Sequence, residues 1–284
     1  MRDSLSLIKQ YRIRPKHKLG QNFLAQPDTA ERILDAAGFD SEDTVIEIGA
    51  GLGGLTIPLA RRVRRVIALE FDRDLVAALN DQLSSSGPSN ITLVEVDALK
   101  YDFTRVAHEL QAPVKVIGNL PYYISSPLLF KLLDHRQAIA EATLMFQREV
   151  ADRLAASPGG KDYGALTVMV AYFATVTTLF HLSPDLFHPR PKVSSALTKI
   201  IFKPSINLRA QNEAIFSRVV KGAFGQRRKT LLNALAGANL PGLPKEMLKE
   251  TLELAEIDGR RRGETLTVEE FVRLADVVSA AVTA

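Results

Sequence analysis

The feature that most constrains the fold is a regular alternation of helix and strand patterns between residues 28 and 135. Four short segments rich in Val, Ile and Leu predict strands: TVIEIGAG, RVIALEFD, NITLVEVDAL and VKVIGN. Amphipathic segments such as PDTAERILDAAG and RDLVAALNDQLSSSG precede or separate them and predict helices. This alternation is typical of an α/β fold, in which helices cover both faces of a parallel sheet.

The pattern changes in the second half of the chain. ATLMFQREVADRLAA passes from a strand to a helix, ALTVMVAYFATVTTLFHL passes from a helix to a strand, and SALTKIIFK predicts a last strand. Two successive late strands predict an antiparallel pair at the edge of the sheet. The remaining residues read as helices, so we place a domain boundary at residue 207. We expect an α/β domain over 1–207 and a small all-helical domain over 208–284.

Positive charge is concentrated in three short segments, although the net charge is only +4. Residues 1–20 carry six Lys or Arg against one acid and form a basic N-terminal arm. The segment GQRRK contains Arg227, Arg228 and Lys229, and a third cluster covers 260–262. Clusters of this kind favour a polyanionic partner. We therefore predict that Arg227, Arg228 and Lys229 bind RNA.

Composition excludes several classes of protein. The chain has no cysteine, so disulfides, thiolate nucleophiles and Cys-ligated zinc are ruled out. The five histidines show no paired ligand spacing, and we expect no metal site. No apolar run approaches the roughly 20 residues that span a bilayer, and the first residues lack the apolar core of a signal peptide. We expect a monomeric cytoplasmic protein that does not contact a membrane.

A glycine-rich turn follows the first predicted strand. In EIGAGLGGLT, Gly49, Gly51 and Gly54 fit G-x-G-x-x-G, and Glu70 ends the second strand. Such glycines let the backbone approach a nucleotide-like ligand, and the carboxylate can accept both ribose hydroxyl protons. The same parts occur in sites for NAD, so the turn alone does not identify the ligand.

Two further acids favour S-adenosylmethionine over NAD. Glu47 precedes the glycines, and Asp97 ends the third strand at the same edge of the sheet. The pyrophosphate of a dinucleotide is repelled by a ring of carboxylates, whereas the sulfonium and ammonium groups of S-adenosylmethionine are attracted. We expect Asp97 to accept a hydrogen bond from the adenine amino group of this cofactor.

The fourth strand runs into the segment NLPYYISSP. An adenine amino nitrogen is a poor nucleophile, and the side-chain oxygen of Asn119 and the carbonyl of Leu120 can each accept one of its hydrogens. These two acceptors would stabilise the positive charge that develops during attack. Pro121 stiffens the turn, and Tyr122 offers a ring on which an unstacked base can lie.

Seven collinear stretches resemble one family over nearly the whole chain. The stretches are KHKLGQNFL, EIGAGLGGLT, LEFD, VDAL, NLPYYISSP, FHPRPKVSSAL and AFGQRRKTLLNAL. They are similar to the ribosomal RNA adenine dimethyltransferase family of the small-subunit (KsgA) type. The glycine turn departs from the family in one respect, because Ala50 stands where members often have proline.

The resemblance implies a fold, an activity and further site residues. The fold would be a Rossmann-like class I methyltransferase domain, with a mostly parallel seven-stranded sheet and an antiparallel edge, followed by a helical RNA-binding domain. Asn22 and Leu24 would line the cofactor pocket with Gly49, Gly51, Glu70, Asp97 and Asn119, and Phe187 would face Tyr122 across the target base. Family members dimethylate two adjacent adenosines in a hairpin loop near the 3′ end of 16S rRNA, in a precursor of the 30S subunit.

Two alternative functions remain open at this point. A related methyltransferase that modifies adenine in 23S rRNA, and confers macrolide resistance, shares the catalytic motifs. The chain could also be a ribosome-assembly factor in which methylation is secondary or lost. Intact Asn119, Tyr122, Glu70 and Asp97 argue against loss of activity, and FGQRRKTLLNAL favours the small-subunit enzyme.

Overall fold

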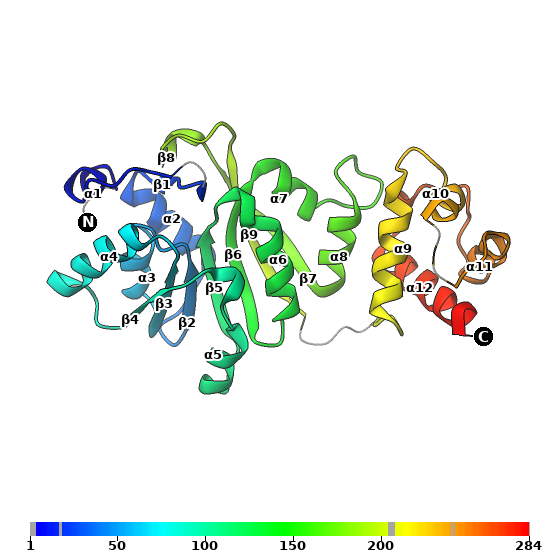
Figure 1. Ribbon diagram of the computed structural model, residues 1–284, viewed down its shortest axis with the longest axis horizontal. Helices are drawn as coiled ribbons and strands as arrows, with labels where there is room; N and C mark the ends of the chain where they lie inside the picture. The colour runs from blue at the N-terminus through cyan, green and yellow to red at the C-terminus, as the bar shows by residue number, and fades with distance from the viewer. Residues whose placement is uncertain (1–3, 17–18, 204–207, 239, 241, 284) are drawn as a thin grey trace. The chain divides into compact units, whose positions relative to one another are not determined.

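The computed structural model describes residues 4–16, 19–203, 208–238, 240 and 242–283 (Figure 1). It divides into two compact units, Met1–Ala151 with Thr175–Pro204, and Asp152–Ala174 with Ser205–Ala284. The predicted boundary, residue 207, lies outside the described residues. The sequence placed 152–174 in the first domain, whereas in the structure this segment groups with the C-terminal helices.

The first unit is built on a seven-stranded sheet in the order β4-β3-β2-β5-β6-β9-β7. Its strands are β2 (Thr44–Ile48), β3 (Arg65–Glu70), β4 (Ile91–Glu95), β5 (Val114–Asn119), β6 (Ile139–Gln147), β7 (Ala174–Leu182) and β9 (Ser195–Phe202). Strands β4, β3, β2, β5 and β6 pair in parallel, and β9 pairs antiparallel with β6. The predicted fold class, a mostly parallel seven-stranded sheet with an antiparallel edge, is confirmed.

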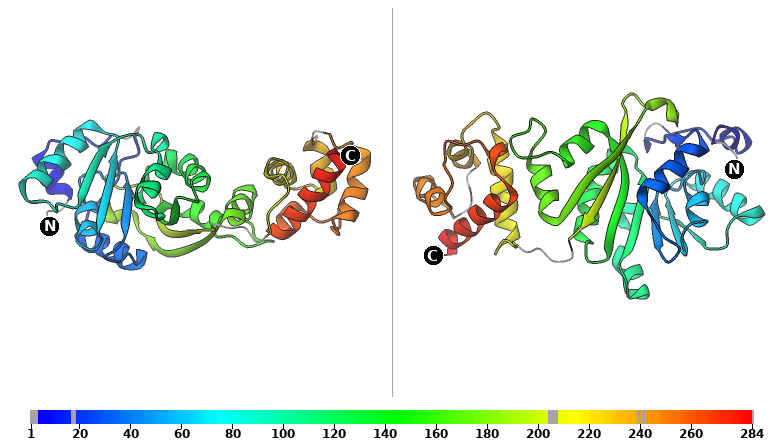
Figure 2. Two further views of the ribbon diagram at one scale, coloured as in Figure 1. Left: turned by 90° about the horizontal axis from the view of Figure 1, so that it is seen from below. Right: turned by 180° about the vertical axis from the view of Figure 1, so that it is seen from behind.

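Helices lie on both sides of this sheet (Figure 2). They are α2 (Pro27–Ala37), α3 (Thr56–Ala60), α4 (Arg73–Ser86), α5 (Phe103–Leu110), α6 (Ser125–Asp134) and α7 (Arg148–Leu154), with short 3-10 turns η2 (Ala98–Lys100), η3 (Tyr122–Ile124) and η4 (Pro184–Leu186). Helix α2 begins with a proline in its first turn and ends at Gly38, whose left-handed backbone closes the helix. Its Ile33 and Leu34 pack in one buried cluster with Val45 of β2 and Val66 of β3. This burial fixes the strand ends where a ligand can bind.

Two small elements near the sheet were not predicted. Helix α1 (Ser4–Gln10) forms within the basic arm, because its Leu7 is buried against Phe23, Leu52 and Leu75. Strand β1 (Phe23–Leu24) pairs antiparallel with β8 (Phe187–His188) in a separate two-stranded sheet. Two-residue strands carry no periodicity that a sequence pattern can reveal. The sequence placed Phe187 in a loop, but it lies in this strand pair.

The second unit is helical. It contains α8 (Ala165–Phe173), α9 (Glu213–Gly225), α10 (Leu231–Ala238), α11 (Leu248–Leu254) and α12 (Val268–Thr283), with η5 (Lys245–Met247) and η6 (Gly263–Thr265). Helices α9 and α12 lie side by side in this unit (Figure 2). Segment 152–174 joins them because Tyr172 of α8 stacks on Phe216 of α9 with ring centroids 4.4 Å apart. The Tyr172 hydroxyl also accepts a hydrogen bond of 2.9 Å from the N–H of Ala210.

Candidate active site

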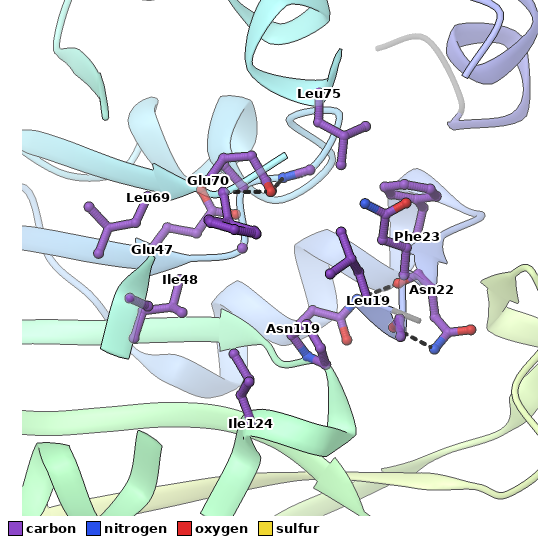
Figure 3. Close-up of a pocket in the computed structure, with 18 of the residues that line it drawn as sticks. Leu19, Asn22, Phe23, Glu47, Ile48, Leu69, Glu70, Leu75, Asn119 and Ile124 are labelled. Carbon is purple, nitrogen blue, oxygen red and sulfur yellow. Dashed lines mark hydrogen bonds between the residues drawn. The ribbon is translucent and has the colours of Figure 1, made fainter. Parts of the chain in front are cut away.

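A pocket lies at the carboxyl ends of the parallel strands, where α/β proteins bind ligands. It is lined by the glycine turn after β2, by Glu70 at the end of β3, by Asp97 after β4 and by Asn119 at the end of β5. The segment before α2 closes a further side, with Asn22 among the lining residues (Figure 3). Leu24 of the same segment also lines the pocket. The structure therefore brings together every residue that was predicted to bind the cofactor.

The glycine turn is held against β3 by backbone hydrogen bonds. Gly49 and Gly51 have φ angles of 81° and 58°, in the left-handed region that glycine adopts without strain. The N–H groups of Gly49 and Ala50 both donate to the carbonyl of Leu69, at 2.9 and 3.1 Å. Gly54 is the third glycine of the sequence motif, but the third residue of the turn with a left-handed backbone is Gly53. The turn thus keeps its main chain open toward the pocket.

Glu70 is oriented by three backbone donors. Its Oε2 accepts from the N–H of Gly51 at 2.8 Å, and its Oε1 accepts from Phe71 and Asp72 at 2.8 and 2.9 Å. Burial raises the pKa of Glu70, while these three hydrogen bonds act in the opposite direction. A carboxylate has about four acceptor positions, so Glu70 keeps capacity for a ligand hydroxyl.

Asp97 and Tyr123 stand at another side of the pocket. Asp97 caps η2, because its Oδ1 accepts from the N–H of Leu99 at 2.9 Å. Tyr123 also lines the pocket. Burial raises the pKa of Tyr123, and the charges of Asp97 and Glu70 add to the effect. This edge of the pocket is therefore negative and aromatic.

Asn119 is fixed by one hydrogen bond that also sets the direction of its oxygen. Its Nδ2 donates to the main-chain carbonyl of Asn22 at 2.7 Å (Figure 3). Only the NH₂ group of the amide can donate to a carbonyl, so the side-chain oxygen is the other branch of the planar amide and points away from this contact. The next side chain, Leu120, is buried and anchors the peptide, while Pro121 lines the pocket. The amide of Asn119 is held as an acceptor.

The two predicted stacking rings are placed differently from expectation. The hydroxyl of Tyr122 shares a 2.9 Å hydrogen bond with Oγ of Ser195, the first residue of β9. Among the described residues that line the pocket, the tyrosine is Tyr123, which is 58% exposed, rather than Tyr122. Phe187 is only 4% exposed and pairs with Leu24 across the β1–β8 sheet. In this conformation the ring of Phe187 is covered by protein.

The N-terminal arm is tied by a basic residue to the chain segment that follows Glu70. Lys16 Nζ contacts Asp72 Oδ1 at 2.7 Å and Asp74 Oδ2 at 2.9 Å, and Nε2 of Gln21 donates to Asp72 Oδ2 at 2.6 Å. The N–H of Asp72 in turn donates to Glu70. Lys16, one of the cations of the arm, thus forms ion pairs within the protein instead of binding a polyanion.

Several pocket residues had no role assigned from the sequence. They include Phe71, which is exposed beside Glu70, and Tyr123. Their adjacency to Glu70 and to NLPY was a signal in the sequence, but the local turn geometry decides which ring faces the pocket. Glu47 was noted only as a charge, and the structure buries it in the pocket wall.

The basic clusters of the second unit are partly engaged within the protein. Arg227 forms an ion pair of 2.7 Å with Glu264, and its guanidinium also donates to the carbonyl of Lys161. Arg228 and Lys229 are exposed. In the third cluster Arg260 and Arg261 pair with the acids Asp258 and Glu270, respectively. The cations that face solvent in GQRRK are therefore Arg228 and Lys229, together with the exposed part of Arg227.

Two other kinds of site, for a metal ion and for a membrane, can be assessed in the part of the chain that the structure describes. Within the described ranges, no group of three or more His, Asp or Glu side chains is arranged to hold a metal ion. Among the same residues no helix is both long and apolar enough to span a bilayer.

Two solved structures resemble this chain along most of its length. A dimethyladenosine transferase from Plasmodium falciparum superposes with a TM-score of 0.76 and 30% identity, covering 89% of this chain and 95% of that one. The 23S rRNA methyltransferase ErmE superposes with a TM-score of 0.68 and 26% identity, covering 90% and 99%. The sheet order, the glycine turn and the acid at the end of β3 define a class I methyltransferase.

The family profile described as "Ribosomal RNA adenine dimethylase" matches residues 12–276. The chain belongs to the ribosomal RNA adenine dimethylase family, and the predicted enzyme class is confirmed. A "Ribosomal RNA small subunit methyltransferase A" from Moorella thermoacetica is 45% identical over 278 residues, covering 95% of each chain. A relative with the same name from Desulforapulum autotrophicum is 42% identical over 272 residues, covering 96% of this chain and 95% of the relative.

Proposed function

We propose that this enzyme uses S-adenosylmethionine to dimethylate the N6 groups of two adjacent adenosines in the hairpin loop near the 3′ end of 16S rRNA. The acceptor is a precursor of the 30S subunit, and the enzyme acts as a single chain. The observation that carries the proposal is the fixed amide of Asn119, whose Nδ2 is committed to the Asn22 carbonyl at 2.7 Å. Its oxygen is then available as an acceptor for an adenine amino group.

The pocket fits the proposed cofactor. S-adenosylmethionine, when bound, supplies an electrophilic methyl group. Glu70 is suited to the ribose hydroxyls because its carboxylate is held by the N–H of Gly51, Phe71 and Asp72 and keeps an acceptor position. Oδ1 of Asp97 accepts a hydrogen bond from the N–H of Leu99, which leaves Oδ2 to accept one from the adenine amino group. Gly49 and Gly51 let the backbone come close to the ligand, and Asn22 and Leu24 cover it.

The chain promotes transfer by placing two oxygen acceptors around the target nitrogen. The Asn119 side-chain oxygen and the Leu120 carbonyl each take one hydrogen of the adenine amino group, which favours a tetrahedral nitrogen. They also stabilise the positive charge that develops during attack. Pro121 limits the backbone motion of Leu120, and burial of the Leu120 side chain anchors it. The methylated nitrogen is acidic enough to lose its proton to water without a strong base.

The target base must leave its stack to reach this site. We assign the stacking surface to the ring of Tyr122, which the hydrogen bond to Ser195 holds in place, and to Phe187 on the opposite side. Because Phe187 is buried against Leu24, stacking on its face requires the β1–β8 pair to shift. The exposed ring of Tyr123 extends the aromatic surface at the pocket itself.

RNA binding is assigned to the basic arm and to the helical domain, residues 208–284. Arg228 and Lys229 are exposed and free to approach phosphates, and Arg227 contributes with the part of its side chain that the Glu264 pair leaves exposed. Phosphate contacts of this kind fix position and are sensitive to salt.

A second candidate function is methylation of adenine in 23S rRNA, and the likeness to ErmE favours it. The small-subunit assignment is supported more strongly, because the relatives at 45% and 42% identity carry that name over nearly their full length. Transfer of tritium from labelled cofactor to unmodified 30S and 50S subunits, followed by nucleoside analysis, tests both. We expect label in N6,N6-dimethyladenosine from 30S subunits. Label confined to 50S subunits would establish the alternative, and no transfer with tight subunit binding would favour an assembly factor.

A further inference from the structure

Glu47 is a buried acid in the wall of the cofactor pocket. It lies on β2, two residues before Gly49, and its side chain is 1% exposed. Its Oε2 has no hydrogen-bond partner among the described residues, and neither has Oγ1 of the neighbouring Thr56. A charged carboxylate that is buried beside a single hydroxyl and without a cation is strongly disfavoured, so this acid is expected to hold a proton while the pocket holds no cation.

The groups around Glu47 do not supply a positive charge. Thr56 on α3 offers a hydroxyl, and Glu70 on β3 adds a negative charge. On β5 the residue paired with Glu47 is Ile117, and the nearby Lys115 is engaged by Asp43 at 2.7 Å. Burial raises the pKa of Glu47 to about 8; the Thr56 hydroxyl opposes this shift and the charge of Glu70 reinforces it.

We propose that Glu47 is a further cofactor-binding residue, which is neutral in the empty pocket and releases its proton when the cationic cofactor binds. The inference rests on S-adenosylmethionine as the proposed cofactor. No other bond changes: the proton of Glu47 passes to the buffer, and the carboxylate that remains pairs with the cationic end of the ligand. An opposite charge within about 4–6 Å lowers a carboxyl pKa by roughly 1–3 units, which is enough to ionise Glu47 at neutral pH.

The pH dependence of affinity follows from this linkage. Between about pH 6 and 7.5 the free pocket holds a proton that the complex lacks, so affinity should increase with pH by up to about tenfold per unit. Above the pKa of Glu47 this gain disappears. The affinity should be measured only up to about pH 7.5, because the α-amino group of the ligand loses its own proton at about pH 8 and would change the affinity as well.

Isothermal titration calorimetry of the full-length enzyme tests the proposal. S-adenosylmethionine and S-adenosylhomocysteine are titrated at pH 7 in buffers of different ionisation enthalpy, and the slope gives the number of protons released. We expect a release of about 0.4 to 0.9 proton for the wild type with S-adenosylmethionine. If S-adenosylhomocysteine releases the same number, the ammonium group drives the change; if it releases fewer, the sulfonium contributes.

Two variants make the test specific to one residue. Glu47→Gln should bind with no proton release and with an affinity that stays flat between pH 6 and 7.5. Glu42→Gln, at an exposed acid near the start of β2, should behave as the wild type. Infrared difference spectra of the wild type provide a measurement that does not depend on the folding of a variant. Binding should remove the C=O stretching band of a protonated carboxyl group.

The outcomes separate this inference from the proposed function. Binding of the cofactor by the wild type without proton release, or equal release by Glu47→Gln, would overturn the role of Glu47 and leave the cofactor assignment intact. Failure of the wild type to bind S-adenosylmethionine at all would instead refute the proposed cofactor.

Discussion

Replacing Asn119 with alanine should abolish most methyl transfer while leaving RNA binding nearly intact. The side-chain oxygen of Asn119 is one of two acceptors for the target amino group, and its direction is set by the 2.7 Å bond to Asn22. Removing one such preoriented dipole from an active site typically lowers kcat by about 10² to 10³, or about 3–4 kcal/mol of transition-state stabilisation. We expect a loss of this size for Asn119→Ala.

The effect on binding should be much smaller. One hydrogen bond to one base contributes about 1 kcal/mol, so the Kd for RNA should change by less than about fivefold. The variant also leaves the Asn22 carbonyl without its donor, which should cost about 1–3 kcal/mol of stability. Melting temperature and cofactor Kd are therefore measured in parallel, and kcat is measured at saturating cofactor.

Single-turnover transfer of tritium to unmodified small subunits is the appropriate assay, because it isolates the chemical step from product release. Asn233→Ala serves as a matched control, since this exposed amide lies in α10 of the second unit and is not among the residues that line the pocket. Its rate should equal that of the wild type. A rate for Asn119→Ala within about threefold of the wild type would refute the role that we assign to this amide.

Three further predictions concern charge and packing. Burial alone would raise the pKa of Asp72, but hydrogen bonds from the arm lower it below its ordinary value. The ionised carboxylate therefore stabilises the fold above about pH 4, and Asp72→Asn should be less stable than the wild type there. As the pH falls below about 4, the melting temperature of the wild type should drop more than that of Asp72→Asn. Reversing Arg228 and Lys229 together to glutamate should weaken RNA binding and reduce the salt slope by up to about one unit per lost phosphate contact; an unchanged slope would place the RNA elsewhere. A Cβ on Gly118 would lie 2.8 Å from the carbonyl of Ile48, so Gly118→Ala should cost about 1–3 kcal/mol in denaturant unfolding and lower kcat by displacing Asn119. Gly225→Ala, at the last residue of α9 and with open space around it, should do neither.

The sheet could be predicted from sequence because its signals are local. The buried strand at 44–48 is a run of apolar and β-branched residues broken only by Glu47, and the glycines after it mark the turn without further information. Parallel strands place their carboxyl ends along one edge, so Glu70, Asp97 and Asn119 were expected to meet, and they do. The order of acids and amide along the chain was enough to locate the pocket.

The parts that escaped prediction depend on contacts between residues far apart in the chain. Lys16 pairs with Asp72, 56 residues away, and Arg227 pairs with Glu264, 37 residues away. A count of charges in a short window treats both cations as free for RNA. Phe187 likewise pairs with Leu24 in two-residue strands that carry no pattern of their own.

Local periodicity also gave no reason to separate α8 from the sheet domain. Its sequence is apolar nearly all round, so the face that it buries is decided by its partners. The stacking of Tyr172 on Phe216 and the hydrogen bond from Ala210 draw this helix into the C-terminal unit. A contact between distant residues also decides which tyrosine lines the pocket. The hydroxyl of Tyr122 forms a hydrogen bond with Ser195 of β9, and Tyr123 lines the pocket instead.

A crystal structure of the protein soaked with adenosine and S-adenosylhomocysteine would examine the catalytic arrangement itself. We expect the exocyclic nitrogen of the adenosine within about 3 Å of both Oδ1 of Asn119 and the carbonyl oxygen of Leu120. The sulfur of S-adenosylhomocysteine should lie on the side of this nitrogen that faces away from the two oxygens. An adenosine bound in the pocket with this nitrogen directed away from both oxygens would contradict the mechanism.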